Sequence, residues 1–249
     1  MTYITATGSD RIGMQIYRRL WTACFAAAEG IQYVHTPIGE PYESVFNLGR
    51  NYPNISDVDP NKVTIFNEKQ TNFQPIVRRG FFADFSGEVV SSILKNYDPQ
   101  ATPVHNKTTI AIHVRRDDIL APEYAKSQPV LLRHTTDQQL QTIFDNIHSL
   151  IKTPCITSIH TDGEIQISNF NTHGIPTTVY GRDTPALMAM QDMIAADILF
   201  PSGISGFSGV AGIYNKNLVI DLELNERPLP YSKLYLQKNR KTIQALCQL

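Results

Sequence analysis

Short β-branched runs alternate along the chain with longer stretches of helical periodicity. Residues 3–7 form such a run and predict a strand, and an Ala- and Leu-rich helical pattern follows from about residue 14 until Gly30. Residues 31–35 predict the next strand. A strand, a glycine-containing loop, a helix and a second strand form a βαβ unit, which implies a parallel sheet.

The rest of the first half has a more broken pattern. Residues 36–60 are rich in Pro, Gly and Asn and predict loops around one short helix, and residues 63–66 predict a strand. Residues 80–95 predict a turn and a helix. Residues 96–103 contain two prolines and no periodicity, so we expect them to link two halves of the chain.

A second series of strands and helices follows this linker. The run at residues 108–114 is almost continuously apolar or β-branched, as expected for a strand that is buried on both faces. Further strands are expected at residues 155–160, 177–180, 198–200 and 218–221. Further helices are expected at residues 137–150, 184–196, 207–214 and 231–249, with a short helix or turn at 165–170.

This alternation predicts an α/β fold of two small Rossmann-like halves, whose parallel sheets face a central cleft. We place the first half at residues 1–100, the second at 104–225, and a C-terminal helix that packs back on them at 226–249. Ligands bind such sheets at the carboxyl ends of the strands, so the site is expected there.

Composition excludes several classes of function. The 249 residues include 22 Lys and Arg against 23 Asp and Glu, and a net charge of -1 argues against a strongly basic nucleic-acid binder. No apolar run approaches the roughly 18–20 residues of a membrane span, and the first residues lack the pattern of a secretory signal. The three cysteines include no CxxC pair, which argues against a disulfide scaffold or a cysteine zinc site. We therefore expect no nucleic-acid partner, no membrane span, and a location in the cytoplasm or on the cytosolic side of a membrane system.

The strongest chemical signal is Ile-His-Val-Arg-Arg-Asp-Asp at residues 112–118, where a buried strand runs directly into charged residues. Its carboxyl end is where ligands bind in open α/β sheets. Arginine forks match phosphate oxygens, so Arg115 and Arg116 together suit a diphosphate. The alternative is an ordinary charged loop in which Arg and Asp side chains pair with one another.

A second signal lies at residues 201–212, where a Ser- and Gly-rich loop opens a helix. Free N–H groups and hydroxyls at a helix N-terminus form a seat for an anion, although a simple capped turn has the same composition. The sequence contains no P-loop and no dinucleotide fingerprint, and the seven histidines show no ligand spacing. We therefore expect neither a metal nor a cofactor.

The run from His113 to Asp118 resembles the H-x-R-R-x-D motif of the fucosyltransferase superfamily, which includes α-1,2, α-1,6 and protein-O-fucosyltransferases. Phe207 and Ser208, in the small-residue loop after Ala-Asp-Ile-Leu, resemble the later Ser-Ser-Phe-Ser motif of that superfamily.

Two looser elements of the first half resemble the same superfamily. Residues 8–15, with Gly8, Arg11 and Gly13, are similar to its opening glycine loop, and residues 80–82 are similar to its Gly-Tyr-Phe segment. The four elements occur in the expected order.

The resemblance implies a GT-B-like fold and an inverting, metal-independent glycosyltransferase. The donor in this superfamily is usually GDP-fucose, and the second partner is a glycan acceptor. Met14 and Gly206 depart from the family pattern and put the donor in doubt, so UDP-xylose or another UDP-sugar is an alternative. A non-catalytic glycan- or nucleotide-binding protein on the same scaffold is the other alternative.

The resemblance also implies roles for individual residues. Arg115 would bind the β-phosphate, His113 would lie against the ribose or base, and Asp192 would contact the base. The full set of implied donor contacts is His113, Arg115, Arg116, Asp118, Asp192, Ser205, Phe207 and Ser208. Residues of the opening loop implied in donor or acceptor binding are Gly8, Arg11 and Gly13.

Inverting transfer needs a base that takes the proton of the acceptor hydroxyl. Glu123 is the first candidate, because it follows His113 at the spacing of the proposed base in the α-1,6 branch. Asp117 is the second candidate, and its two arginine neighbours are expected to lower its pKa and make it the poorer base.

Overall fold

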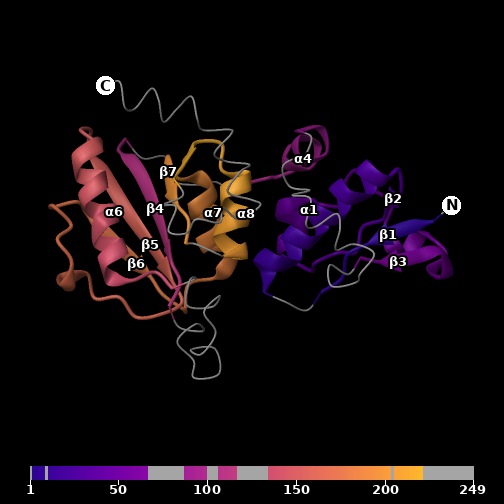
Figure 1. The fold of residues 1–249 in the computed structure, drawn as a ribbon, viewed down its shortest axis with the longest axis horizontal. Coiled ribbons are helices and arrows are strands. Elements are labelled where there is room, and N and C mark those ends of the chain that lie inside the picture. The colour runs from indigo at the N-terminus through magenta and orange to yellow at the C-terminus, as the bar shows by residue number, and fades with distance from the viewer. Residues whose placement is uncertain are drawn as a thin grey trace. The chain divides into compact units, whose positions relative to one another are not determined.

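The protein is described by a computed structural model, in which two compact units, Met1–Gln100 and Ala101–Leu249, divide the chain (Figure 1). The structure describes residues 2–8, 11–66, 87–99, 106–116, 134–202 and 205–220. Each unit contains a parallel β-sheet with helices, so the α/β prediction with two parallel sheets is confirmed. The expected C-terminal helix at 226–249 and the aromatic segment at 80–82 lie outside the described residues.

The first unit is built on a small parallel sheet in the order β2-β1-β3. Its strands are β1 (Tyr3–Thr5), β2 (Gln32–Tyr33) and β3 (Val63–Ile65). Its helices are α1 (Ile12–Glu29), α2 (Tyr42–Phe46), α4 (Gly87–Leu94) and the 3₁₀ turns Ile55–Asp57 and Pro60–Lys62. The strand expected at 31–35 is shorter than predicted, and beyond it His35 forms only an isolated bridge to Asn54.

Helix α1 contributes more buried apolar side chains than any other element in the described part of this unit. Its buried face includes Leu20 and Trp21, and the Trp21 ring packs edge-on against Phe66 with ring centroids 5.4 Å apart. The helix ends at Gly30, whose φ of 65° is the left-handed conformation that glycine adopts at low cost. No helix in the described parts of the chain, α1 included, is both long and apolar enough to cross a membrane.

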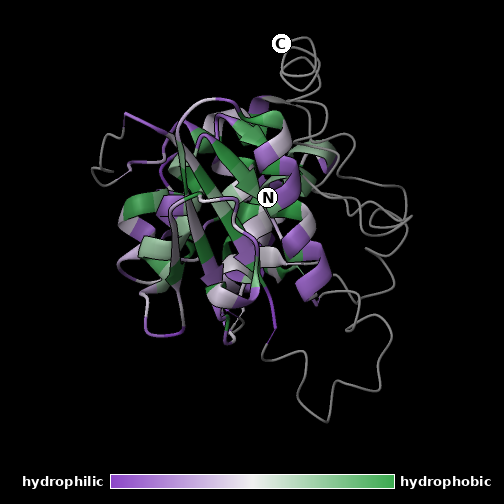
Figure 2. Ribbon diagram, turned by 90° about the vertical axis from the view of Figure 1, so that its left-hand side faces the viewer, coloured by the Kyte–Doolittle hydropathy of each residue, from purple (hydrophilic) through white to green (hydrophobic). Residues whose placement is uncertain are grey.

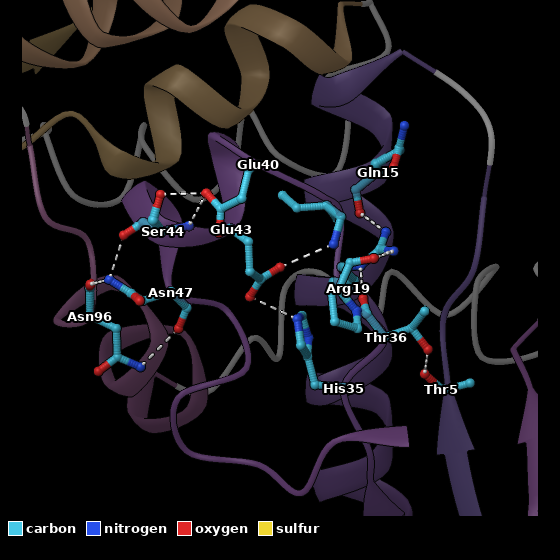
Figure 3. Close-up of polar contacts among 12 residues, drawn as sticks. Thr5, Gln15, Arg19, His35, Thr36, Glu40, Glu43, Ser44, Asn47 and Asn96 are labelled. Atoms are coloured by element: carbon cyan, nitrogen blue, oxygen red, sulfur yellow. Dashed lines mark hydrogen bonds and ion pairs between the residues drawn. The ribbon is translucent and has the colours of Figure 1, made fainter. Parts of the chain in front are cut away.

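A buried polar network holds the loop that follows β2 (Figure 3). His35 Nε2 lies 2.9 Å from Glu43 Oε1, and Glu43 Oε2 accepts a hydrogen bond from the Ile38 amide at 3.0 Å. The guanidinium of Arg19 donates to the carbonyl oxygens of Thr36 and Pro37, at 2.6 and 3.2 Å. The charged groups therefore hydrogen-bond to backbone groups of this partly buried loop and hold its conformation.

The second unit contains a five-stranded parallel sheet in the order β6-β5-β4-β7-β8. Its strands are β4 (Thr108–Val114), β5 (Cys155–Thr161), β6 (Thr177–Tyr180), β7 (Ile198–Phe200) and β8 (Leu218–Val219). Its helices are α6 (Asp137–Leu150), α7 (Ala186–Ala195), α8 (Gly206–Tyr214) and the 3₁₀ turn Ile167–Asn169. These bounds differ from the expected ones by at most two residues at each end.

Strand β4 is buried on both faces because helices cover both sides of the sheet (Figure 1). Ile110, Ile112 and Val114 pack with α6, which contributes Phe144 to the same apolar cluster. Figure 2 shows hydrophobic colour along the strands of this layer. Alternation along a strand sends intervening side chains to the opposite face, so His113 points toward α7 and α8.

The order of the sheet reverses beside β4. The chain moves outward from β4 through β5 to β6, then returns to place β7 on the other side of β4. In open α/β sheets, ligands bind outside the carboxyl ends of the strands at such a reversal. The fold therefore locates the expected site of this unit where β4 and β7 end.

Candidate functional site

The carboxyl ends of β4 and β7 bring both sequence signals together. Ile112 of β4 is the register partner of Phe200 of β7, so the two strands end at the same edge. His113 and the two arginines follow from β4, and Pro201 and Ser202 follow from β7. Two segments that are far apart in the sequence thus meet at one edge of the sheet.

A buried hydrogen bond joins these segments directly. The Nδ1 atom of His113 lies 3.0 Å from the Oγ atom of Ser208, near the start of α8. The same hydroxyl donates to the carbonyl oxygen of Ser202 at 3.4 Å. A hydroxyl has one proton, so when it bonds that carbonyl it accepts from the N–H of His113 Nδ1. Ser208 is fully buried here, and its expected contact with a diphosphate stays a prediction.

The N-terminus of α8 lies at the same edge of the sheet. Ser205 precedes the helix, is buried, and makes no side-chain capping bond to it. Helix N-termini concentrate unpaired N–H groups and positive dipole, which favours an anion. The ring of Phe207, in the first turn, lies with its centroid 5.7 Å from that of His113. This edge of the sheet thus combines helix N–H groups that suit an anion with the aromatic ring of Phe207.

Arg115 and Arg116 follow β4 and are both half-buried. The Arg116 guanidinium forms an ion pair with Asp137 in the first turn of α6. The backbone N–H of Arg116 donates to Asp162 Oδ1 at 2.8 Å. The carbonyl of Arg115 accepts from the Thr135 amide at 3.1 Å. Arg116 is therefore partly engaged by an acid outside its own segment.

The imidazole of His134 lies near Arg116 and Asp137. Burial lowers the pKa of His134, and the neighbouring charge of Arg116 lowers this pKa further. Asp137 acts in the opposite direction but does not reverse the shift. Burial is therefore the main cause of the lowered pKa of His134.

Three ring side chains lie next to one another near the ends of three adjacent strands. His113 of β4 is the register partner of His160 of β5, and His160 is the register partner of Tyr180 of β6. Register partners in a parallel sheet share a face, so the row lies on the α7 and α8 side. The His160 and Tyr180 rings stack with centroids 5.1 Å apart and planes 10° apart. His160 also contacts Asp192 of α7, at 2.6 Å between Nε2 and Oδ2.

Three residues of this region were not predicted from the sequence: His160, Tyr180 and Ser202. The Ser202 hydroxyl is buried without a hydrogen-bond partner among the described residues. A signal for His160 does exist in the sequence, because β4 contains Ala-Ile-His and β5 contains Ser-Ile-His, each directly before the last residue of the strand. Repetition of this order in two consecutive strands indicates equivalent positions in a parallel sheet.

The opening-loop residues lie in the first unit, where the loop leaves β1. Arg11 is the residue before α1, and Gly13 is buried in its first turn. Gly8 approaches the Arg18 side chain so closely that an added Cβ would lie 2.8 Å from Arg18 Nη1. These residues all belong to the first unit.

Three predicted residues, Asp117, Asp118 and Glu123, lie outside the described residues. Within the described ranges, no cluster of three or more His, Cys, Asp or Glu side chains is arranged to hold a metal ion. The structure thus brings together His113, Phe207 and Ser208, and it places Asp192 against His160 on the adjacent strand. Arg115 and Arg116 follow His113 in the chain, and the Arg116 side chain pairs with Asp137 of α6.

Comparison with known proteins supports the fold. No protein-family model matches the sequence, and no curated protein matches it. The structure resembles the crystal structure of NodZ α-1,6-fucosyltransferase soaked with GDP-fucose, with a TM-score of 0.54 and 13% identity over 91% of this chain and 97% of that one. It also resembles POFUT1 in complex with GDP-fucose, with a TM-score of 0.50 and 13% identity over 87% of this chain and 94% of that one. The GT-B-like fold expected from the sequence is therefore confirmed.

Proposed function

We propose that the protein is an inverting, metal-independent glycosyltransferase that moves a sugar from a nucleotide-diphosphate donor, with GDP-fucose favoured, to a hydroxyl of a glycan. The observation that supports this most is the His113–Ser208 hydrogen bond, which joins the Arg-containing end of β4 to the N-terminus of α8. Arginine forks and helix N-terminal amides both suit a diphosphate. Structural likeness to proteins crystallised with GDP-fucose agrees with this donor.

In this proposal, each part of the donor has its own set of contacts. Arg115 and Arg116 bind the diphosphate, with the first turn of α8 and Ser205 on its other side. His113 and Phe207 lie against the ribose or base, and Asp192 contacts the base. Asp118 orients the arginines.

The reaction breaks the bond between the anomeric carbon and the diphosphate oxygen as the acceptor oxygen bonds to the opposite face of that carbon. The bonding electron pair passes to the diphosphate, whose growing charge Arg115, Arg116 and the α8 amides stabilise. The acceptor proton passes to Glu123, or to Asp117 as the second candidate. Gly8, Arg11 and Gly13 contribute a loop on the donor or acceptor side.

A transfer assay tests the proposal. The protein is incubated with GDP-fucose, UDP-xylose, UDP-glucose or UDP-galactose and a panel of glycans, with and without EDTA. Mass spectrometry detects the product, and NMR gives its anomeric configuration. We expect transfer from GDP-fucose with inversion, equal in EDTA, and lost in Glu123→Gln. Nucleotide binding without any transfer would instead support a non-catalytic binding protein, and transfer only from a UDP-sugar would change the donor.

A further inference from the structure

Two side chains of β5 hold the carboxylate of Asp192. Ser158 Oγ and His160 Nε2 each lie 2.6 Å from Asp192 Oδ2. Ser158 and His160 are two positions apart on one strand, so both point to the face covered by α7. Because a carboxylate only accepts hydrogen bonds, the hydroxyl and the Nε2–H donate to it. Two donors on one oxygen fix where this carboxylate lies.

His160 is too deeply buried to contact a ligand itself. Its side chain is 3% exposed, whereas the side chain of Asp192 is 47% exposed. Tyr180 covers the imidazole by parallel stacking. The other ring nitrogen, Nδ1, is buried without a hydrogen-bond partner among the described residues. The polar contact of His160 is thus directed to Asp192, and a ligand can sense His160 only through that carboxylate.

The register of the sheet places this group beside the candidate site. His160 lies opposite His113 on the adjacent strand, and His113 is bonded to Ser208 at the start of α8. Through His160, Asp192 is therefore held against β5, the strand next to β4, at whose end we propose that the donor binds.

We infer that Ser158 and His160 are positioning residues, which fix Asp192 as an acceptor for the N–H edge of the donor base and so favour guanine over uracil. This inference rests on the proposed function, in which Asp192 contacts the base. Guanine offers two adjacent N–H donors, at N1 and N2, to the carboxylate, whereas uracil offers a single N–H at N3. A carboxylate that is already fixed loses less conformational freedom when it binds.

Four variants separate this role from a general effect on folding. Ser158→Ala removes one donor with little change in volume. His160→Phe keeps a ring against Tyr180 but removes the other donor, and His160→Gln restores an N–H donor at the end of a side chain of similar reach. Thr157→Val is the matched control, because Thr157 is buried on the opposite face of the same strand and its hydroxyl has no hydrogen-bond partner among the described residues.

Calorimetric titration gives the dissociation constants for GDP and UDP in each protein. We expect the wild type to prefer GDP, and Ser158→Ala and His160→Phe to weaken GDP binding about tenfold while UDP changes less. His160→Gln should retain most of the preference and Thr157→Val all of it.

The possible results separate the two levels of the account. A wild type that binds GDP while Ser158→Ala and His160→Phe keep its GDP-to-UDP ratio would overturn the inference and leave the proposed function intact. A wild type that prefers UDP would also overturn the inference. A wild type that binds neither nucleotide would overturn the proposed function together with the inference. If His160→Phe does not fold, Ser158→Ala still decides the question.

Discussion

The Nδ1 atom of His113 lies 3.0 Å from the Oγ atom of Ser208, although 95 residues separate the two in the chain. One residue belongs to the central strand of a parallel sheet, and the other to the first turn of a helix three strands further along the chain. Their hydrogen bond fixes the helix N-terminus relative to the strand end from which Arg115 and Arg116 follow. Two elements that each suit an anion are thereby held at one place.

Ser208→Ala should weaken both the fold and nucleotide binding. The substitution removes a buried hydrogen bond and leaves His113 Nδ1 without it, so the free energy of unfolding should fall by about 1–2 kcal/mol. Affinity for GDP should fall as well, because the α8 N-terminus is less firmly held. Urea unfolding and calorimetry measure the two effects. Ser149→Ala, at an exposed serine of α6, is the control, and equal GDP affinity in Ser208→Ala and this control would refute the role of the contact.

Asp137→Asn should strengthen diphosphate binding. In the structure this carboxylate pairs with the Arg116 guanidinium and so competes with a ligand for the same cation. Because Asp137 is largely exposed, losing the pair should change stability by less than about 1 kcal/mol. A titration with GDP should show severalfold tighter binding, whereas Glu29→Gln, which removes the same charge from an exposed site in the first unit, should not. Weaker binding in Asp137→Asn would show that Arg116 needs its partner to bind the donor.

Gly49→Ala should destabilise the first unit. A Cβ at this position would lie 2.3 Å from Cδ2 of His35, whose ring is fixed by its bond to Glu43. Forcing the ring aside should cost roughly 1–3 kcal/mol. Gly181→Ala is the control, since a Cβ there meets nothing within 4 Å. Thermal unfolding of the two variants gives the comparison, and equal melting temperatures would contradict the packing described.

Glu43 should make the stability of the protein depend on acidic pH. Burial raises the pKa of this carboxyl, but hydrogen bonds from His35 and the Ile38 amide outweigh it, and the net pKa lies below the ordinary 4.5. A lowered folded-state pKa contributes stability above the ordinary pKa, which is lost as the pH falls through the folded value. Glu43→Gln should therefore cost about 1 kcal/mol at pH 7, with the gap narrowing between about pH 5 and pH 3. Urea unfolding across this range measures the gap, and a constant gap would be the contrary result.

Periodicity was sufficient to predict most elements of the fold. The apolar run of β4 and the helical pattern of α6 are long, so their types and bounds follow from local sequence. The strand at 31–35 fared less well, because only Gln32 and Tyr33 find ladder partners in the narrow sheet of the first unit. Whether a β-branched residue joins a ladder depends on its neighbours in space, which periodicity does not contain.

Part of the candidate site could likewise be predicted from the sequence, and part could not. The linear run from His113 to Arg116 could be identified from its sequence alone. The row of His113, His160 and Tyr180 could not, because it depends on the register of three strands. The pairing of Arg116 with Asp137 could not be predicted from the sequence either, because the start of α6 brings Asp137 close from 21 residues away.

The most direct test of the central claim is a thermal-shift and calorimetric titration with GDP, UDP and their sugar conjugates, in EDTA, on the wild type and Arg115→Ala. Arg50→Ala, at an exposed arginine of the first unit, is the control. Ligand at about 100 times its dissociation constant adds about 2.7 kcal/mol to the free energy of unfolding. We predict that GDP stabilises the wild type and Arg50→Ala, that EDTA does not change this, and that Arg115→Ala loses it. No stabilisation by any nucleotide, or the same stabilisation in Arg115→Ala, would contradict a diphosphate site at the end of β4.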